Sequence, residues 1–225
     1  MRRLAAAFAL ALAVAAPAAA LETEGEAWFQ VTASGPIHGR LLGFAEIQPR
    51  FGEDGQDGDF DTTAWIGRGA LGWQVLEGWS LWAGYGYTPT FDPDRDEHRI
   101  FQQSLYDWRL GPVHAQHRAR LEERFLEHES EASWRLRNQL RFVYPLPSLP
   151  TWSLVLADEV FLNLNTVDDG PDSGFDQNRV FAGVSHQLSR HVRVEVDYLN
   201  QFVHRTGGKE DVMRHGAMVQ LALTW

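Results

Sequence analysis

The chain contains no cysteine. This absence excludes a disulfide framework, a zinc site built on thiolates and catalysis by a cysteine nucleophile. Basic residues are also scarce, because 20 lysines and arginines stand against 30 acidic residues and the net charge is −10. A nucleic-acid-binding protein normally carries a basic patch, so we expect no nucleic-acid partner. No long apolar run follows the N-terminal segment, which excludes a bundle of membrane-spanning helices.

Residues 1–20 have the composition of a secretory signal peptide. Arg2 and Arg3 form a positive region, a short apolar core follows, and Ala18 to Ala20 fit the small-residue rule for cleavage. The alternative is a retained anchor helix, but the apolar core is shorter than the about 20 residues that a span requires. We therefore expect an exported protein whose mature chain forms a single domain over residues 21–225, without the cysteine that a lipid anchor would need.

Beyond this segment, apolar and polar residues alternate along most of the chain. Between Val192 and Tyr198 every second residue is large and apolar, and charged residues lie between them. Such alternation is typical of a β-strand with two different faces. The stretch from His114 to Arg141 is rich in Arg, Leu and Glu and would also suit a helix. Arg118, Arg120, Glu122 and Arg124 share one parity, however, which favours strands over the helical alternative.

Turn-forming segments divide the chain from residue 52 onward, and long breaks alternate with short ones. The long polar breaks are Gly52–Asp59, Asp92–Glu97, Leu126–Ser130, Thr166–Gly174 and Arg205–Asp211. The short breaks are Glu77–Gly78, Leu110–Pro112, Pro145–Pro150 and Leu188–His191. Bacterial outer-membrane barrels have long external loops and tight periplasmic turns. The pattern therefore predicts an all-β protein, a transmembrane antiparallel up-and-down β-barrel in the outer membrane of a Gram-negative bacterium.

The breaks define ten strands and leave one segment unassigned. The predicted strands are about 38–51, 60–76, 79–90, 98–108, 113–125, 131–144, 151–164, 175–188, 191–204 and 212–225. Residues 27–32 also resemble a strand, and Ser34 to Pro36 resemble a turn. Eleven strands would break the even-number rule for single-chain bacterial barrels. We therefore expect about ten strands, with twelve as the alternative.

The C-terminal strand is amphipathic and ends on an aromatic residue. It resembles the signal that the barrel-assembly machinery reads, and the residues that would carry this signal are Gly216, Val219, Leu221, Leu223 and Trp225. The alternative is a terminal strand without such a role. The signal predicts two partners, the assembly machinery and outer-membrane lipid, and leaves the oligomeric state open.

Four segments of the mature chain resemble one known family. They are Arg118–Phe125, Trp134–Arg141, Glu159–Asn163 and Asn178–Val184, and they are similar to the uncharacterised bacterial family called domain of unknown function 2490, which is grouped with outer-membrane β-barrels. The resemblance implies a fold and a location. It implies no reaction, substrate, cofactor or catalytic residue.

A charge facing lipid at the bilayer midplane costs about 2–4 kcal/mol. The apolar residues of each strand are therefore expected to face lipid, and the residues that alternate with them are expected to face the lumen. The predicted lumen residues are ten arginines and five carboxylates: Glu46, Arg50, Arg68, Arg118, Arg120, Glu122, Arg124, Arg135, Arg137, Arg141, Glu159, Arg179, Arg193, Glu195 and Asp197. Two interpretations follow. These residues pair with one another and fill a narrow barrel or pore, or the arginine surplus binds an anion such as a lipid phosphate.

An enzyme that hydrolyses or transfers acyl groups of outer-membrane lipid is a third hypothesis. Ser185 and His186 are adjacent, so in a strand they face opposite sides and cannot hydrogen-bond to each other. His114 and His117 likewise differ in parity. The acidic loop from Asp54 to Asp59 lacks the glutamate that a calcium-binding EF-hand loop requires at its twelfth position. We therefore assign no catalytic residue, metal or cofactor.

Overall fold

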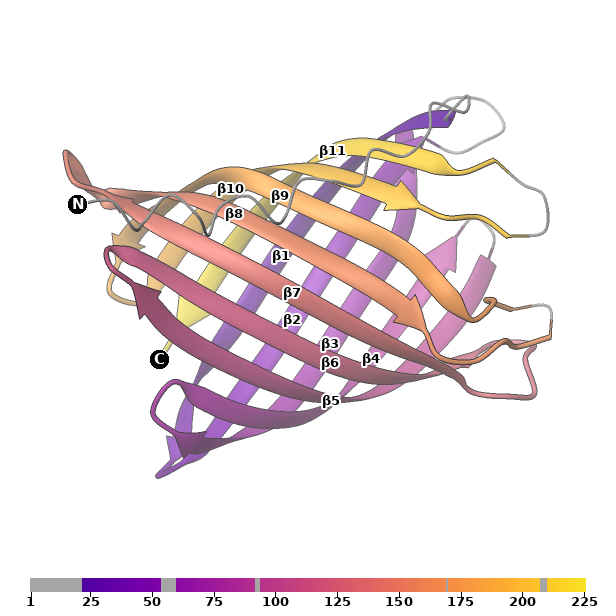
Figure 1. The fold of residues 1–225 in the computed structure, drawn as a ribbon, viewed down its shortest axis with the longest axis horizontal. Coiled ribbons are helices and arrows are strands. Elements are labelled where there is room, and N and C mark those ends of the chain that lie inside the picture. Colours follow the sequence, from indigo (N-terminus) through magenta and orange to yellow (C-terminus); the bar gives the residue numbers. More distant parts are fainter. Residues whose placement is uncertain (1–21, 54–59, 92–93, 169, 207–209) are drawn as a thin grey trace, which may run out of the picture.

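The structure is a computed structural model that describes residues 22–53, 60–91, 94–168, 170–206 and 210–225. Figure 1 shows one closed barrel of inclined strands. The eleven strands are β1 (Glu22–His38), β2 (Leu41–Glu53), β3 (Phe60–Leu76), β4 (Trp79–Phe91), β5 (Asp94–Leu110), β6 (Val113–Leu126), β7 (Ser133–Leu146), β8 (Leu149–Asn163), β9 (Gly174–Ser189), β10 (Val192–Val203) and β11 (Val212–Thr224). No helix in these ranges is long and apolar enough to cross a membrane.

The predicted all-β barrel is confirmed, and the predicted strand counts of ten and twelve are wrong. The segment that the sequence left unassigned is β1, which continues through the expected turn at Ser34 to Pro36 as far as His38. With an odd number of strands, the first and last run in the same direction. They close the barrel as a parallel pair, from Glu22 opposite Val212 to Ser34 opposite Thr224, whereas all other neighbours are antiparallel.

The two ends of the barrel differ in their connections. At one end, here called the turn end, five connections of two residues each link β1–β2, β3–β4, β5–β6, β7–β8 and β9–β10. Gly78 and Gly111 lie in two of these turns with φ of +74° and +60°, values that favour glycine. The opposite end, here called the loop end, carries the longer connections, on the right in Figure 1. One predicted long break is wrong, because only residues 92 and 93 separate β4 from β5.

Alternation along each strand divides side chains between the lumen and the outer face. Trp28, Ile66 and Phe161 point inward and are at most 2% exposed, whereas Leu71 and Tyr198 on the outer face are 59% and 50% exposed. The stretch 114–141, for which a helix was the alternative, forms β6 and β7. The outer face is therefore a broad apolar surface, and the lumen is where the polar residues gather.

Aromatic side chains fill the lumen along β2 to β5. Trp82 packs against Gly72, and a Cβ at Gly72 would lie 2.5 Å from the indole ring. Phe101 packs against Gly84 in the same way, and Phe44 contacts Trp82 edge-on with ring centroids 6.5 Å apart. Because these rings occupy that wall, the charged residues concentrate on the opposite wall, formed mainly by β6 to β10.

Candidate functional site

The structure turns all fifteen predicted lumen residues toward the interior of the barrel. Nine are buried, and the other six, all arginines, are half-buried. The nine buried residues are Glu46, Arg120, Glu122, Arg135, Arg137, Glu159, Arg179, Glu195 and Asp197. Most of the fifteen join one of three groups: a central cluster on β6 to β8, a group around Glu97 near the loop end, and a charged group near the turn end.

Glu122 on β6 is the centre of the first group. It is fully buried, and its Oε2 accepts hydrogen bonds from Arg135 Nε and a terminal nitrogen at 3.0 and 2.8 Å. Its Oε1 accepts one from Arg137 at 2.8 Å, and Arg120 lies 3.6 Å away. These contacts follow from the register, because Glu122 lies opposite Arg135 and next to Arg137 on the neighbouring strand. One carboxylate thus serves three arginines.

Glu159 on β8 continues this cluster. Its Oε1 accepts hydrogen bonds from Arg137 at 2.8 and 3.0 Å and from Arg118 at 2.9 Å. Arg137 therefore bridges Glu122 and Glu159 with all three of its nitrogens. The arrangement orients the guanidinium groups of Arg135 and Arg137 rigidly, because each of these two planar groups donates three hydrogen bonds.

A second group, formed by Glu97, Arg99 and Arg124, was only partly predicted. Glu97 on β5 accepts two hydrogen bonds from Arg99, at 2.5 and 2.7 Å, and two from Arg124, at 2.5 and 3.1 Å. The sequence prediction contained Arg124 but assigned Glu97 to a loop and omitted Arg99. Because β5 begins at Asp94, both are strand residues. Their alternation with His98 and Ile100 was the signal that could have identified them.

Two lumen arginines stack on Trp28 and have no carboxylate partner in the part of the chain that the structure describes. The guanidinium carbon of Arg50 lies 3.7 Å from the indole centroid, and that of Arg179 lies 4.8 Å from it. Arg50 donates hydrogen bonds to Gln48 and Arg179 donates one to Gln177. Among the described residues neither arginine has an acidic group within ion-pair distance. Cation–π contact therefore substitutes in part for a counter-charge.

Two cavities enter the barrel from its two ends. The turn-end vestibule has a volume of about 640 Å³ and the loop-end vestibule one of about 430 Å³. The two vestibules share four lining residues, Arg50, Arg68, Arg137 and Arg179, here called the central arginine layer. The loop-end vestibule is lined by five further arginines, Arg95, Arg99, Arg124, Arg135 and Arg214. The lumen is thus not filled, and both cavities reach the same positively charged layer.

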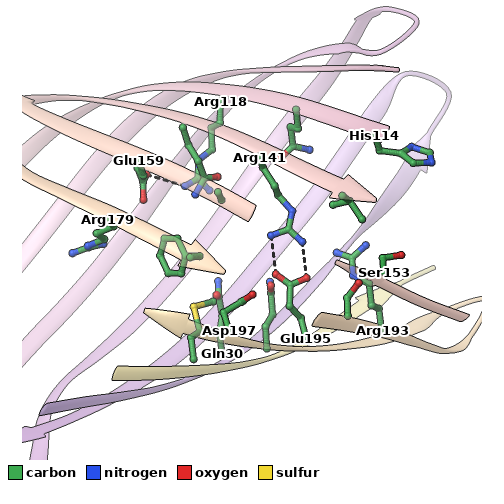
Figure 2. Close-up of a pocket in the computed structure, with 18 of the residues that line it drawn as sticks. Gln30, His114, Arg118, Arg141, Ser153, Glu159, Arg179, Arg193, Glu195 and Asp197 are labelled. Atoms are coloured by element: carbon green, nitrogen blue, oxygen red, sulfur yellow. Dashed lines mark hydrogen bonds and ion pairs between the residues drawn. The ribbon is translucent and has the colours of Figure 1, made fainter. Parts of the chain in front are cut away.

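Charges of both signs line the turn-end vestibule. Figure 2 shows Arg141 pointing across the cavity to Glu195, to which its two terminal nitrogens donate hydrogen bonds at 2.7 and 2.5 Å. Asp197 lies beside Glu195 on β10, and Arg193 lines the same cavity. This vestibule is therefore electrostatically mixed, in contrast to the loop-end vestibule, where Asp176 is the only carboxylate among the described lining residues.

The histidines and serines of the acyl-transfer hypothesis are not brought together. Ser185 is buried and faces the lumen, whereas the ring of His186 stacks on Trp152 with centroids 4.3 Å apart. His114 lines the turn-end vestibule, and His117 contacts Asn138 at 3.3 Å. Within the described ranges no serine hydroxyl hydrogen-bonds to a histidine ring; Ser189 Oγ accepts only from the backbone N–H of His191, at 3.2 Å. No group of three or more potential metal ligands occurs there either, and the acidic loop 54–59 lies outside the described residues.

The residues of the predicted assembly signal all lie on or directly after β11. Gly216 packs against the backbone of Glu26 on β1, where a Cβ would collide with the carbonyl oxygen. The indole nitrogen of Trp225 donates a hydrogen bond to the Pro36 carbonyl at 3.0 Å, and its ring lies against Gly35. These contacts join β11 and Trp225 to the first strand, and those of Trp225 lie at the turn end.

Comparison with known proteins places the chain in one family. The profile of a protein family of unknown function, DUF2490, matches residues 25–213. An uncharacterized protein of Methylorubrum extorquens is 34% identical over 209 residues, which cover 89% of this chain and 88% of that protein. No solved structure matches. The predicted family resemblance is thereby confirmed.

Proposed function

The chain belongs to the DUF2490 family of proteins of unknown function, and we propose that it is an integral outer-membrane β-barrel that conducts small anions along a narrow path. One observation carries this proposal. Two cavities, of about 640 and 430 Å³, enter from opposite ends and meet at the central arginine layer. A barrel closed by side chains would leave no such pair of cavities.

The charge of the central arginine layer favours anions over cations. Arg68 pairs with Glu46 at 2.5 Å, and Arg137 pairs with Glu122 and Glu159. Arg50 and Arg179 lack carboxylate partners in the described structure and lie over the same indole ring. Rings of arginine or lysine select anions in pores, because a fixed positive charge in a narrow passage repels cations.

The outer face supports the membrane part of the proposal. Large apolar side chains such as Leu71, Leu154 and Tyr198 project from it. Two pairs of polar residues on this face hydrogen-bond to each other, since Asn178 donates to Asp158 at 3.2 Å and His117 contacts Asn138 at 3.3 Å. Polar groups that face hydrocarbon are costly unless they are hydrogen-bonded within the protein.

Export through the predicted signal peptide of residues 1–20 and insertion by the barrel-assembly machinery complete the proposal. Residues 1–21 lie outside the described structure. In cells, the mature protein is expected in the outer-membrane fraction with an N-terminus within a few residues of Leu21. Fractionation followed by N-terminal sequencing measures both. A mature protein that still begins at Met1 would contradict the export step.

Conductance measured in planar lipid bilayers tests whether anions pass through the lumen. In a potassium chloride gradient, purified protein is expected to give a small conductance whose reversal potential shows a preference for chloride. Replacing both Arg50 and Arg179 by glutamine should lower that preference, since it removes the two arginines of the layer that lack a carboxylate partner. Arg190→Gln in the exposed β9–β10 turn removes the same kind of charge at the surface and is the matched control.

Three results would contradict the proposal. A folded, inserted protein without measurable current would support a closed ionic plug with a structural role. A preference for potassium would contradict the assigned selectivity. Release of fatty acid from outer-membrane lipid would support the hydrolase hypothesis instead.

A further inference from the structure

The loop-end vestibule has an unusual composition for a cavity inside a barrel. Its described lining residues include nine arginines and one carboxylate, Asp176. The floor is the central arginine layer, and Gly170 and Pro171 of the β8–β9 connection also line it. At about 430 Å³ it falls within the size range of small-molecule sites, which is about 300–1,000 Å³.

The carboxylates that orient these arginines are too few to neutralise them. Glu97 alone holds Arg99 and Arg124. Glu122 and Glu159 together serve Arg118, Arg120, Arg135 and Arg137. Arg68 pairs with Glu46, Arg95 with Glu129, and Arg214 with Glu24 and Glu26, while Glu24 also contacts Arg205. With Asp176, which lies 3.4 Å from Arg135, eight carboxylates thus serve ten arginines, and Arg50 and Arg179 have no carboxylate partner among the described residues.

Several guanidinium donors are left over after these pairings. Arg99 and Arg124 each use Nε and one terminal nitrogen on Glu97, which leaves the other terminal nitrogen of each without a hydrogen bond inside the described structure. Arg179 is 7% exposed, and its Nε is buried without a partner. Buried donors and uncompensated buried charges are costly, so a ligand that accepts these hydrogen bonds would stabilise the site.

We propose that the loop-end vestibule binds a multivalent oxyanion of the phosphate class. Two kinds of observation select this chemistry. The guanidinium group is planar and matches two oxygens of a phosphate in a bidentate way. The arginines are already oriented by Glu97 and Glu122, so binding requires little loss of side-chain freedom. The volume exceeds that of a single phosphate and suits a phosphate ester or a diphosphate. This inference rests on the proposed function, because the same lumen must admit anions from the loop end.

Titration calorimetry with pyrophosphate as the probe tests the site. Full-length protein in phosphate-free detergent should bind about one pyrophosphate per barrel. Arg99→Gln should weaken binding about tenfold or more, because a lost charge-assisted hydrogen bond of about 1.4 kcal/mol corresponds to a factor of ten. Arg124→Gln is a second variant with the same expectation, since it removes the other arginine on Glu97. Arg190→Gln should bind as the wild type does.

A phosphorylated lipid headgroup and a soluble phosphorylated solute share this chemistry, and a competition arm distinguishes them. Lipid A added in detergent would displace pyrophosphate if the site takes a lipid phosphate, and its dephosphorylated form would not. Displacement by glycerol phosphate but not by lipid A would indicate a soluble solute. Either displacement supports the proposal.

The absence of pyrophosphate binding to folded wild-type protein would overturn the inference, as would equal binding by wild type, Arg99→Gln and Arg124→Gln. Heat-modified gel mobility verifies that each variant is folded. The two proposals fail separately. Anion current without pyrophosphate binding contradicts only the site, and pyrophosphate binding without current contradicts only the conducting path.

Discussion

Glu122 on β6 and Arg135 on β7 lie directly opposite each other, and two nitrogens of Arg135 donate to one oxygen of Glu122, at 3.0 and 2.8 Å. The same carboxylate also holds Arg137. This relationship makes Glu122 the residue on which the order of the central cluster depends, because its removal leaves buried arginines facing one another.

Glu122→Ala is therefore expected to destabilise the folded barrel. Breaking a buried ion pair by removing one partner typically costs about 3–5 kcal/mol, since the remaining charge stays buried without compensation. The heat-modified gel shift should occur at a clearly lower temperature than in the wild type. Glu123→Ala is the control, because Glu123 has the opposite parity and points away from the lumen. A silent Glu122→Ala beside a destabilising Glu123→Ala would invert the face assignment.

Trp28→Ala is expected to widen the passage through the central arginine layer. The indole is 2% exposed and supports both Arg50 and Arg179. Removing a large buried aromatic side chain costs about 3–5 kcal/mol of stability and leaves a cavity. Single-channel conductance should rise while the urea concentration needed for unfolding falls. Phe29→Ala, on the outer face of the same strand, should leave conductance as it is. A reduced conductance in Trp28→Ala would show that the ring does not narrow the path.

Deletion of Trp225 is expected to hinder insertion several-fold more than Trp79→Ala does. Trp225 contacts Pro36 and Gly35 on β1, so its loss removes a contact between the last residue and the first strand. Trp79 donates a hydrogen bond to Ser104 at 2.9 Å and lies outside the predicted assembly signal. The amount of each protein in urea-washed outer membranes measures the effect. Equal amounts would count against a role of the C-terminal residue in assembly.

The parallel pairing of β1 with β11, here called the parallel seam, can be tested by cross-linking. The chain has no native cysteine that could form a competing disulfide. Phe29 and Val219 are register partners across β1 and β11. Cysteines at these two positions should form a disulfide on mild oxidation, because neighbouring strands lie about 4.8 Å apart and disulfides join Cα atoms about 4.4–6.8 Å apart. Cysteines at Phe29 and Leu223 should not cross-link, because four residues displace them by about 13 Å along the strand. The opposite result would mean that the register is shifted.

Ten of the eleven strands could be predicted because alternation and turn residues are local signals. The predicted strand 60–76 coincides with β3, and 79–90 and 113–125 each differ from β4 and β6 by one residue. The remaining strand, β1, was not predicted, because the even-number rule for bacterial barrels favoured ten or twelve strands. Its place depends on hydrogen bonds between β1 and β11, which lie almost 200 residues apart in the sequence, and no local pattern records such a pairing.

The candidate site shows the same division between local and non-local information. Odd or even position in the sequence indicated which face of β6, β7 and β10 carries arginine, because successive side chains of a strand point to opposite faces. It could not show that Arg50 and Arg179, from β2 and β9, meet over Trp28 of β1. Glu97 was missed because the Asp-rich sequence around residue 94 resembles a loop, whereas pairing with β4 extends the strand through it. Arg99 lay within the predicted strand 98–108 but was not assigned to the lumen face.

The parallel seam also fixes where the chain can be cut. In a barrel with an even number of strands, the first and last strands run antiparallel, so a short linker joins the termini and new ends can be opened at another turn. Here β1 starts at the loop end and β11 finishes at the turn end. A linker from Thr224 to Glu22 would have to run back along thirteen paired residues, about 43 Å of strand. Circular permutation with a short linker is therefore incompatible with this barrel, and the break between β11 and β1 is set by its topology.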